Sequence, residues 1–164
     1  MNAHNPITQL VETLVQLCSR VPHSVTALLA RFSIAAVFWQ SGQTKVQGFA
    51  INLVDGTFEL GIPSLAPFTV ALFADEYKVP LLSPELAAYL ATFAEHLFPI
   101  LILLGLATRF SSLALLGMTL VIQVFVYPGA YATHGVWAAV LLYLISRGPG
   151  MVALDHLIAK KRCQ

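Results

Sequence analysis

The sequence contains few charged residues and few cysteines. Only 10% of its 164 residues are charged and 57% are hydrophobic, whereas a soluble domain carries about 25% charged residues. This composition excludes an ordinary soluble globular domain and predicts an integral membrane protein whose main partner is the lipid bilayer. The net charge of +1 and the lack of a basic stripe interleaved with aromatic residues argue against nucleic acid as a partner.

The two cysteines, Cys18 and Cys163, do not form a Cys-x-x-Cys unit. They predict free thiols in a reducing compartment rather than a dithiol redox centre. No two histidines stand three or four residues apart on one predicted helix, so no metal site is predicted. The first 23 residues contain one arginine and no continuous apolar run, so we expect no secretory signal there.

One apolar stretch, residues 84–106, is long enough to cross a bilayer and carries an acid at its centre. A helix rises about 1.5 Å per residue, which matches a hydrocarbon core of about 30 Å. An ionised Glu95 at mid-depth costs about 2.5–3.5 kcal/mol, so it needs a cation or a proton. Pro99 is expected to bend the helix one turn later. Glu95 and His96 are either a polar pair that locks helix packing or a proton-handling catalytic or ligand-binding site.

Three further spans are predicted over 25–44, 110–127 and 132–147. The fold class is therefore all-α, a four-helix transmembrane bundle in a single membrane domain over 1–164, with its spans within 25–147. An amphipathic helix within 1–23 is expected to lie on the membrane surface, and 148–164 form a cytoplasmic tail.

The long connection 45–83 has a hairpin signal at Asp55-Gly56 and a short helix with Phe68, Leu72 and Phe73 on its buried side. It is either a solvated acidic cap or a ligand gate.

The basic residues of the connections predict the orientation. Six of them fall on one side of a four-span arrangement, and only Lys45 and Lys78 fall on the other. The positive-inside rule then places both termini in the cytoplasm, as a multi-pass protein of the cell inner membrane. A membrane-impermeant thiol reagent applied to intact cells should then miss both cysteines.

Several polar residues of the spans are candidates for one ligand-binding site. Arg31 lies about 9 Å and Glu95 about 15 Å above the inner ends of their spans, so an extended arginine is expected to reach the carboxylate and form a buried bridge. Gln123 is expected to bond across to a neighbouring helix, or to a ligand. The candidate ligand-binding residues are Arg31, Lys45, Glu95, His96, Gln123 and His134.

Several short motifs resemble the DoxX family of membrane proteins over residues 28–157. The motifs are Arg31, Gly42, Lys45, Glu95, the GLATR sequence at 105–109, and the RGPG sequence with LDHL within 147–157. The resemblance implies a four-helix membrane bundle, and some relatives are subunits of quinone-linked sulfur oxidation or of oxidative-stress complexes. The long 45–83 connection departs from the family pattern, as does Phe98-Pro99, where relatives often carry glycine.

Three functions remain open, and the sequence does not decide whether the protein is an enzyme. The first is a small subunit of a quinone-linked redox or envelope stress-response system, in which Glu95 and His96 handle the proton. This first hypothesis implies quinone as the cofactor. The cysteines are too few for an iron–sulfur cluster, so the electrons would come from a protein partner. The second is a scaffold or assembly factor in which Arg31 and Glu95 fix helix register. The third is a small-solute carrier that acts as a homo-oligomer.

Overall fold

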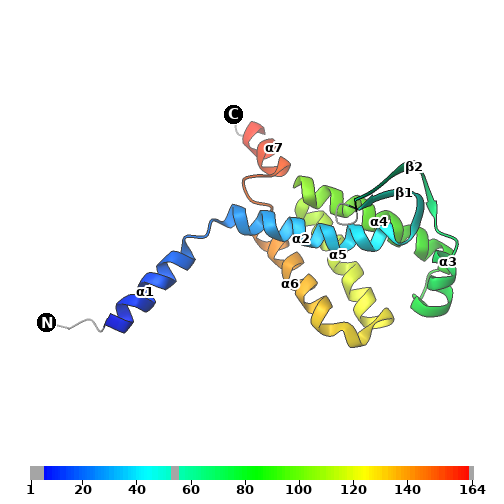
Figure 1. Ribbon diagram of the computed structural model, residues 1–164, viewed down its shortest axis with the longest axis horizontal. Helices are drawn as coiled ribbons and strands as arrows, with labels where there is room; N and C mark the ends of the chain where they lie inside the picture. The colour runs from blue at the N-terminus through cyan, green and yellow to red at the C-terminus, as the bar shows by residue number, and fades with distance from the viewer. Residues whose placement is uncertain (1–5, 53–55, 163–164) are drawn as a thin grey trace.

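The computed structural model describes residues 6–52 and 56–162 of the chain (Figure 1). The predicted turn residue Asp55 and the tail cysteine Cys163 lie outside the described residues. Among the described residues, four helices have the length and apolar composition needed to cross a membrane, which confirms the four predicted spans. They are α2 (His23–Gln43), α4 (Pro84–Leu104), α5 (Thr108–Val121), which continues as a π-helical turn (Ile122–Val126), and α6 (Tyr131–Arg147), which follows a 3₁₀ turn (Pro128–Ala130).

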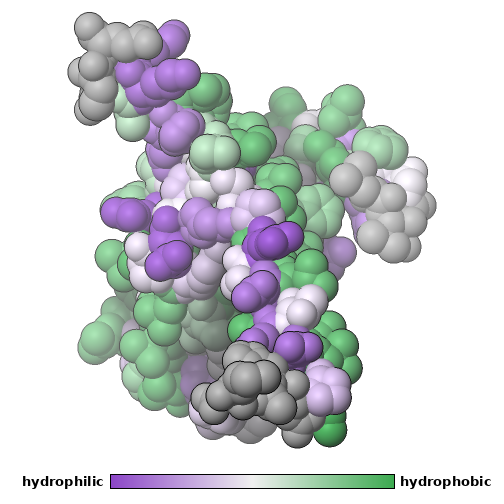
Figure 2. All heavy atoms as spheres, turned by 90° about the vertical axis from the view of Figure 1, so that its left-hand side faces the viewer, coloured by the Kyte–Doolittle hydropathy of each residue, from purple (hydrophilic) through white to green (hydrophobic). Residues whose placement is uncertain are grey.

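The bundle has two distinct ends. The helices that precede and follow the bundle are attached at one of them, which we call the terminal end, where α2 and α5 begin and α4 and α6 finish (Figure 1). The long connection between α2 and α4 lies at the opposite end, which we call the loop end. Figure 2 shows that hydrophilic residues gather on the terminal end, whereas hydrophobic residues cover much of the flanks. This distribution suits a bundle whose flanks face lipid and whose ends face water.

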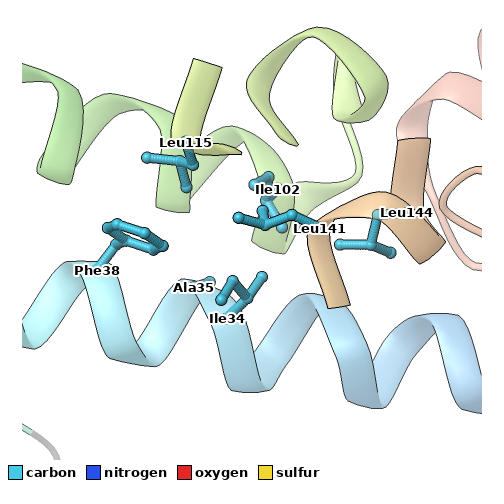
Figure 3. Close-up of a cluster of buried hydrophobic side chains, with 7 residues drawn as sticks. All are labelled: Ile34, Ala35, Phe38, Ile102, Leu115, Leu141 and Leu144. Atoms are coloured by element: carbon cyan, nitrogen blue, oxygen red, sulfur yellow. The ribbon is translucent and has the colours of Figure 1, made fainter. Parts of the chain in front are cut away.

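A buried cluster of apolar side chains holds the four helices together. Ile34, Ala35 and Phe38 of α2 meet Ile102 of α4, Leu115 of α5, and Leu141 and Leu144 of α6 (Figure 3). The helices also bury small polar residues, because Ser111 and Ser112 of α5 are fully buried. Small side chains let neighbouring backbones approach closely, which is how helices associate where lipid removes the hydrophobic drive.

The described segments that flank the bundle are also helical. The helix α1 (Pro6–Ser19) extends away from the bundle (Figure 1) and has no buried residues. Its apolar side chains, such as Leu10 and Leu14, are more than half exposed. The predicted amphipathic helix is thus present, and its place on the membrane surface stays a prediction. The tail forms the helix α7 (Leu154–Arg162).

The connection at the loop end corrects the all-α prediction. It contains an antiparallel hairpin of β1 (Val46–Asn52) and β2 (Thr57–Leu65), so all-α is only approximate. The strands follow the alternation of apolar residues that predicted a hairpin. A one-turn helix α3 (Thr69–Leu72) and a π-helical turn (Phe73–Tyr77) follow. Phe73 is buried as predicted, but Phe68 is 56% exposed and Thr69 takes its place in the interior.

The hairpin folds back along α2 instead of extending from it. Trp39 Nε1 donates to the Ile51 carbonyl at 2.9 Å, and the Ile51 N–H donates to Gln43 Oε1 at 2.7 Å. Both groups of Ile51 are therefore satisfied by α2 side chains rather than by β2. The outer strand β2 exposes three large apolar residues, Phe58, Leu60 and Ile62. The choice between an acidic cap and a ligand gate stays a prediction.

Candidate functional site

A cavity of about 500 Å³ opens at the loop end, between the four helices and the π-helical turn Phe73–Tyr77. Its walls are mainly apolar, with Phe38, Phe98 and Trp137 as the large aromatic members. The polar side chains on its walls are Ser41, Lys45, Tyr77, Glu95, Tyr127 and His134. Cavities that bind small organic molecules combine mostly apolar walls with a few converging polar groups in this way. This cavity is therefore the candidate functional site.

A buried ion pair forms one wall of the cavity. Lys45 Nζ lies 2.8 Å from Glu95 Oε2, and both side chains are about 95% buried, at 5% and 4% exposure. Ser41 joins them, because its hydroxyl donates to Glu95 Oε1 and accepts from Lys45 Nζ, each at 3.0 Å. Lys45 also donates to the Ser41 carbonyl at 3.0 Å. Glu95 Oε2 carries the ion pair but accepts no hydrogen bond of regular geometry from the described residues, so it retains a free direction.

The loop end fixes the position of Lys45 through its backbone. The Lys45 carbonyl accepts from the Ala66 N–H at 2.9 Å and from the Thr69 hydroxyl at 3.0 Å. Lys45 therefore sits between the end of α2 and the start of α3, and its side chain returns into the bundle. The second half of the connection helps to build the cavity, since Phe73 and Tyr77 also line it.

Gly42 lets α2 and α4 meet at this level. A Cβ atom at Gly42 would lie 2.8 Å from His96 Cε1 and 3.1 Å from Glu95 Cβ. Ordinary contacts between such atoms are longer, so any side chain here would push the two helices apart. The glycine thus brings the Ser41 end of α2 within reach of Glu95.

Arg31 does not pair with Glu95, and the predicted bridge is wrong. Its guanidinium donates to carbonyls of Ile102 at 2.8 Å, Pro149 at 3.2 Å and Val152 at 2.5 Å, and also to that of Leu103. The last carbonyls of a helix lack partners within that helix, so the end of α4 attracts the cation. Glu95 lies two turns away along α4, about 10 Å from Ile102, and takes Lys45 instead.

His96 does not line the cavity and packs against α2 instead. Its Nδ1 lies 2.7 Å from the Thr92 carbonyl, which can only accept, so Nδ1 carries the proton. Its Nε2 then accepts from Gln43 Nε2 at 2.9 Å. Both ring nitrogens are engaged, and the ring packs edge-on against Trp39. The structure thus separates His96 from Glu95, although the two are neighbours in sequence.

Gln123 contacts His134, which lines the cavity. His134 Nδ1 lies 2.7 Å from Gln123 Oε1, and Gln123 Nε2 donates to the Pro128 carbonyl at 2.7 Å. Gln123 therefore bonds across to α6, as expected from the sequence. His134 is 95% buried and faces the cavity, whereas Gln123 supports it from behind.

Two tyrosines complete the rim. The Tyr127 hydroxyl donates to Glu76, and the rings of Tyr127 and Tyr77 pack at 5.8 Å. The hydrogen bond to Glu76 raises the pKa of the Tyr127 phenol. Burial raises the pKa of the Tyr77 phenol. Both side chains therefore stay protonated well above neutral pH.

Of the six predicted ligand-binding residues, the structure gathers three on the cavity walls: Lys45, Glu95 and His134. Arg31, His96 and Gln123 hold neighbouring segments in place. Sequence reasoning missed Ser41, which lies in the last turn of α2, four residues before Lys45; this spacing was the available signal. It also missed Tyr77 and Tyr127, which only the folding of the connection brings to the cavity. Among the described residues, no three His, Cys, Asp or Glu side chains come together as a metal site would require.

Comparison with known proteins decides the family. The DoxX family model matches residues 26–128, more than half of the chain. The chain belongs to the DoxX family. A protein of Haemophilus influenzae described as uncharacterized is 29% identical over 149 residues, which cover 83% of this chain and 85% of that relative. No solved structure matches the chain.

The matched range contains the ion pair of the cavity wall in this DoxX protein, whereas the wall residues His134 and Trp137 lie beyond it. Ser41, Gly42, Lys45 and Glu95 all fall within it. The segment from Arg147 to the end of the tail lies beyond it. The ion pair and the glycine contact thus belong to the part of the chain that the family model describes.

Proposed function

We propose that this DoxX-family protein is a small subunit of a quinone-linked redox system, and that the cavity at the loop end binds the quinone. One observation carries the proposal: an apolar cavity has a buried, ionised pair on its wall. An apolar core needs no charged residues for packing, because a buried ion pair is often no more stabilising than apolar side chains of similar volume. The ion pair would instead bind the polar head group of a ligand in the cavity.

The residues suit a molecule with an apolar ring and tail and a polar head. The apolar walls would cover the ring and tail, and Lys45, Ser41 and Glu95 would meet the polar oxygens. A bound quinone would supply reversible carriage of electrons and protons. Glu95 Oε2 has a free direction in which to accept a hydrogen bond or a proton from a hydroxyl group. Lys45 would compensate the negative charge of that carboxylate between such events.

The wider setting of the proposal includes a partner and an orientation. The electrons would come from a protein partner, and an envelope stress response is one process that such a system would serve. The protein is proposed to lie in the cell inner membrane with its terminal end in the cytoplasm. The basic residues Arg20, Arg109, Arg147 and Lys160 near that end support this orientation. The loop end and the cavity then face outward.

A scaffold role is the second candidate. The observation in its favour is that the buried cations hold separate segments together: Arg31 joins α2 to the end of α4 and to the residues before α7, and Lys45 joins the connection to α4. A scaffold would use these contacts for register alone. The two candidates differ in whether the cavity binds a ligand.

The two tryptophans provide a direct binding assay. Trp137 lines the cavity and Trp39 does not, so Trp39→Phe leaves a single fluorophore at the site. We expect a short-chain ubiquinone analogue to quench Trp137 fluorescence saturably in purified protein. In the Trp137→Phe variant, the quenching of Trp39 should remain linear with concentration, as expected for random collision.

A pair of bulky substitutions tests the cavity itself. Ala91→Phe fills space at the cavity wall, and it should abolish saturable quenching. Ala139→Phe adds the same side chain on an exposed part of α6 and should leave binding unchanged. If the variants fold and saturable quenching is absent from the wild type as well, the quinone proposal is refuted and the scaffold role stands.

A further inference from the structure

A second cavity lies at the terminal end, where two sequence motifs meet. The GLATR segment (105–109) and the RGPG segment with LDHL (147–157) are far apart in sequence, yet both line one cavity of about 630 Å³. The proposed function uses neither motif. The cavity therefore requires its own explanation.

Backbone contacts hold both walls of this cavity in place. Asp155 accepts from the N–H groups of Ala107 at 2.8 Å and Thr108 at 2.9 Å, and the Asp155 N–H donates to the Gly105 carbonyl at 2.8 Å. Arg31 holds the carbonyls of Pro149 and Val152 from inside the bundle. The opening of α5 and the segment before α7 thus form a fixed frame.

Two arginine side chains of this cavity have no partner among the described residues. The Asp155 carboxylate is engaged by two backbone N–H groups at the start of α5, whereas Arg109 and Arg147 line the cavity without a hydrogen bond or ion pair to any other described residue. The Arg109 guanidinium lies beside Gly148, since a Cβ there would be in van der Waals contact with Arg109 Nη2 at 3.5 Å. His23 also lines the cavity, and its Nδ1 lies 2.9 Å from the Tyr143 hydroxyl.

We propose that this cavity binds the phosphate group of a phosphate ester between Arg109 and Arg147. A guanidinium presents its N–H groups in a planar fork that matches two phosphate oxygens. The cavity also has an apolar rim, because Phe110 and Met151 line it and are each 66% exposed. These two side chains can contact a glycerol or acyl group, and they favour a phospholipid head group over a soluble phosphate. The site is independent of the quinone proposal.

The test measures lipid retention by the whole protein. Wild type in detergent is titrated with phosphatidylglycerol or phosphatidylcholine, and bound lipid is counted by native mass spectrometry. We expect one phosphatidylglycerol to bind preferentially, and about tenfold or greater weakening in the Arg109→Gln/Arg147→Gln variant, because each hydrogen bond to a charged group contributes on the order of a tenfold change in binding. The Arg109→Lys/Arg147→Lys variant keeps the charge and should retain part of the binding.

A matched control removes the same charge elsewhere. Lys160→Gln/Lys161→Gln lies on α7, outside this cavity, and should bind phosphatidylglycerol as wild type does. Glycerol 3-phosphate is the soluble probe: if it binds with the same dependence on the two arginines and the lipid shows no preference, the phosphate site stands with a soluble ligand. Equal loss of phosphatidylglycerol binding in Arg109→Gln/Arg147→Gln and in Lys160→Gln/Lys161→Gln, or no loss in either variant, overturns the proposal.

Discussion

The pairing of Glu95 with Lys45 rather than with Arg31 can be tested by double-mutant cycles. At 2.8 Å between Lys45 Nζ and Glu95 Oε2, and an effective dielectric constant of about 20, the gross attraction is about 6 kcal/mol. Desolvation of two buried charges offsets much of this attraction. Removing one partner alone leaves the other uncompensated, so Lys45→Met or Glu95→Leu should each lower the free energy of unfolding by about 3–5 kcal/mol.

The double variant should lose less stability than the sum of the two single losses, because it leaves no isolated charge. We expect a coupling energy of about 2–3 kcal/mol between positions 45 and 95, at the upper end of the range for residues in contact. The control cycle is Arg31→Met with Glu95→Leu, whose effects should add within about 0.5 kcal/mol because the two side chains do not touch. The assay is reversible unfolding in detergent, followed by circular dichroism. Additive effects at positions 45 and 95, or strong coupling at 31 and 95, would refute the pairing in the structure.

Further predictions concern the helix contact, the tail, a rim tyrosine and the orientation. Gly42→Ala places a methyl group against α4 and should lower the free energy of unfolding by about 1–3 kcal/mol. Asp155→Asn weakens the capping of α5 and should cost about 1 kcal/mol in the same measurement. The raised pKa of the Tyr127 phenol means that the unfolded chain loses this proton first, so stability should fall as the pH rises above about 10, and fall less in Tyr127→Phe; equal pH profiles in denaturation midpoints would contradict it. In a Cys163→Ser variant, an impermeant thiol reagent on intact cells should not label Cys18, and labelling would reverse the proposed orientation.

The spans and the hairpin could be predicted from the sequence because their causes are local. A run of apolar residues of bilayer length requires a helix, whose backbone groups bond within the segment. Alternation of apolar residues around a turn signal likewise predicted β1 and β2. The resemblance to the DoxX family, carried by short motifs in a fixed order, was confirmed by the family match. Glu95 was recognisable as a buried acid that needed a partner, because its cost depends on depth alone.

The identity of that partner depended on the tertiary structure. The sequence placed Arg31 within reach of Glu95 by depth, but hydropathy does not distinguish a carboxylate from a helix end as the acceptor for an arginine. The packing of α2 against α4 places Arg31 level with the last carbonyls of α4. The turn after α2 returns Lys45 into the bundle, and Gly42 lets the two helices approach closely enough for the pair to form. Sequence therefore determined which residues must be buried, and the packing of the helices decided which of them meet, because that choice depends on distances of a few ångströms between segments remote in the chain.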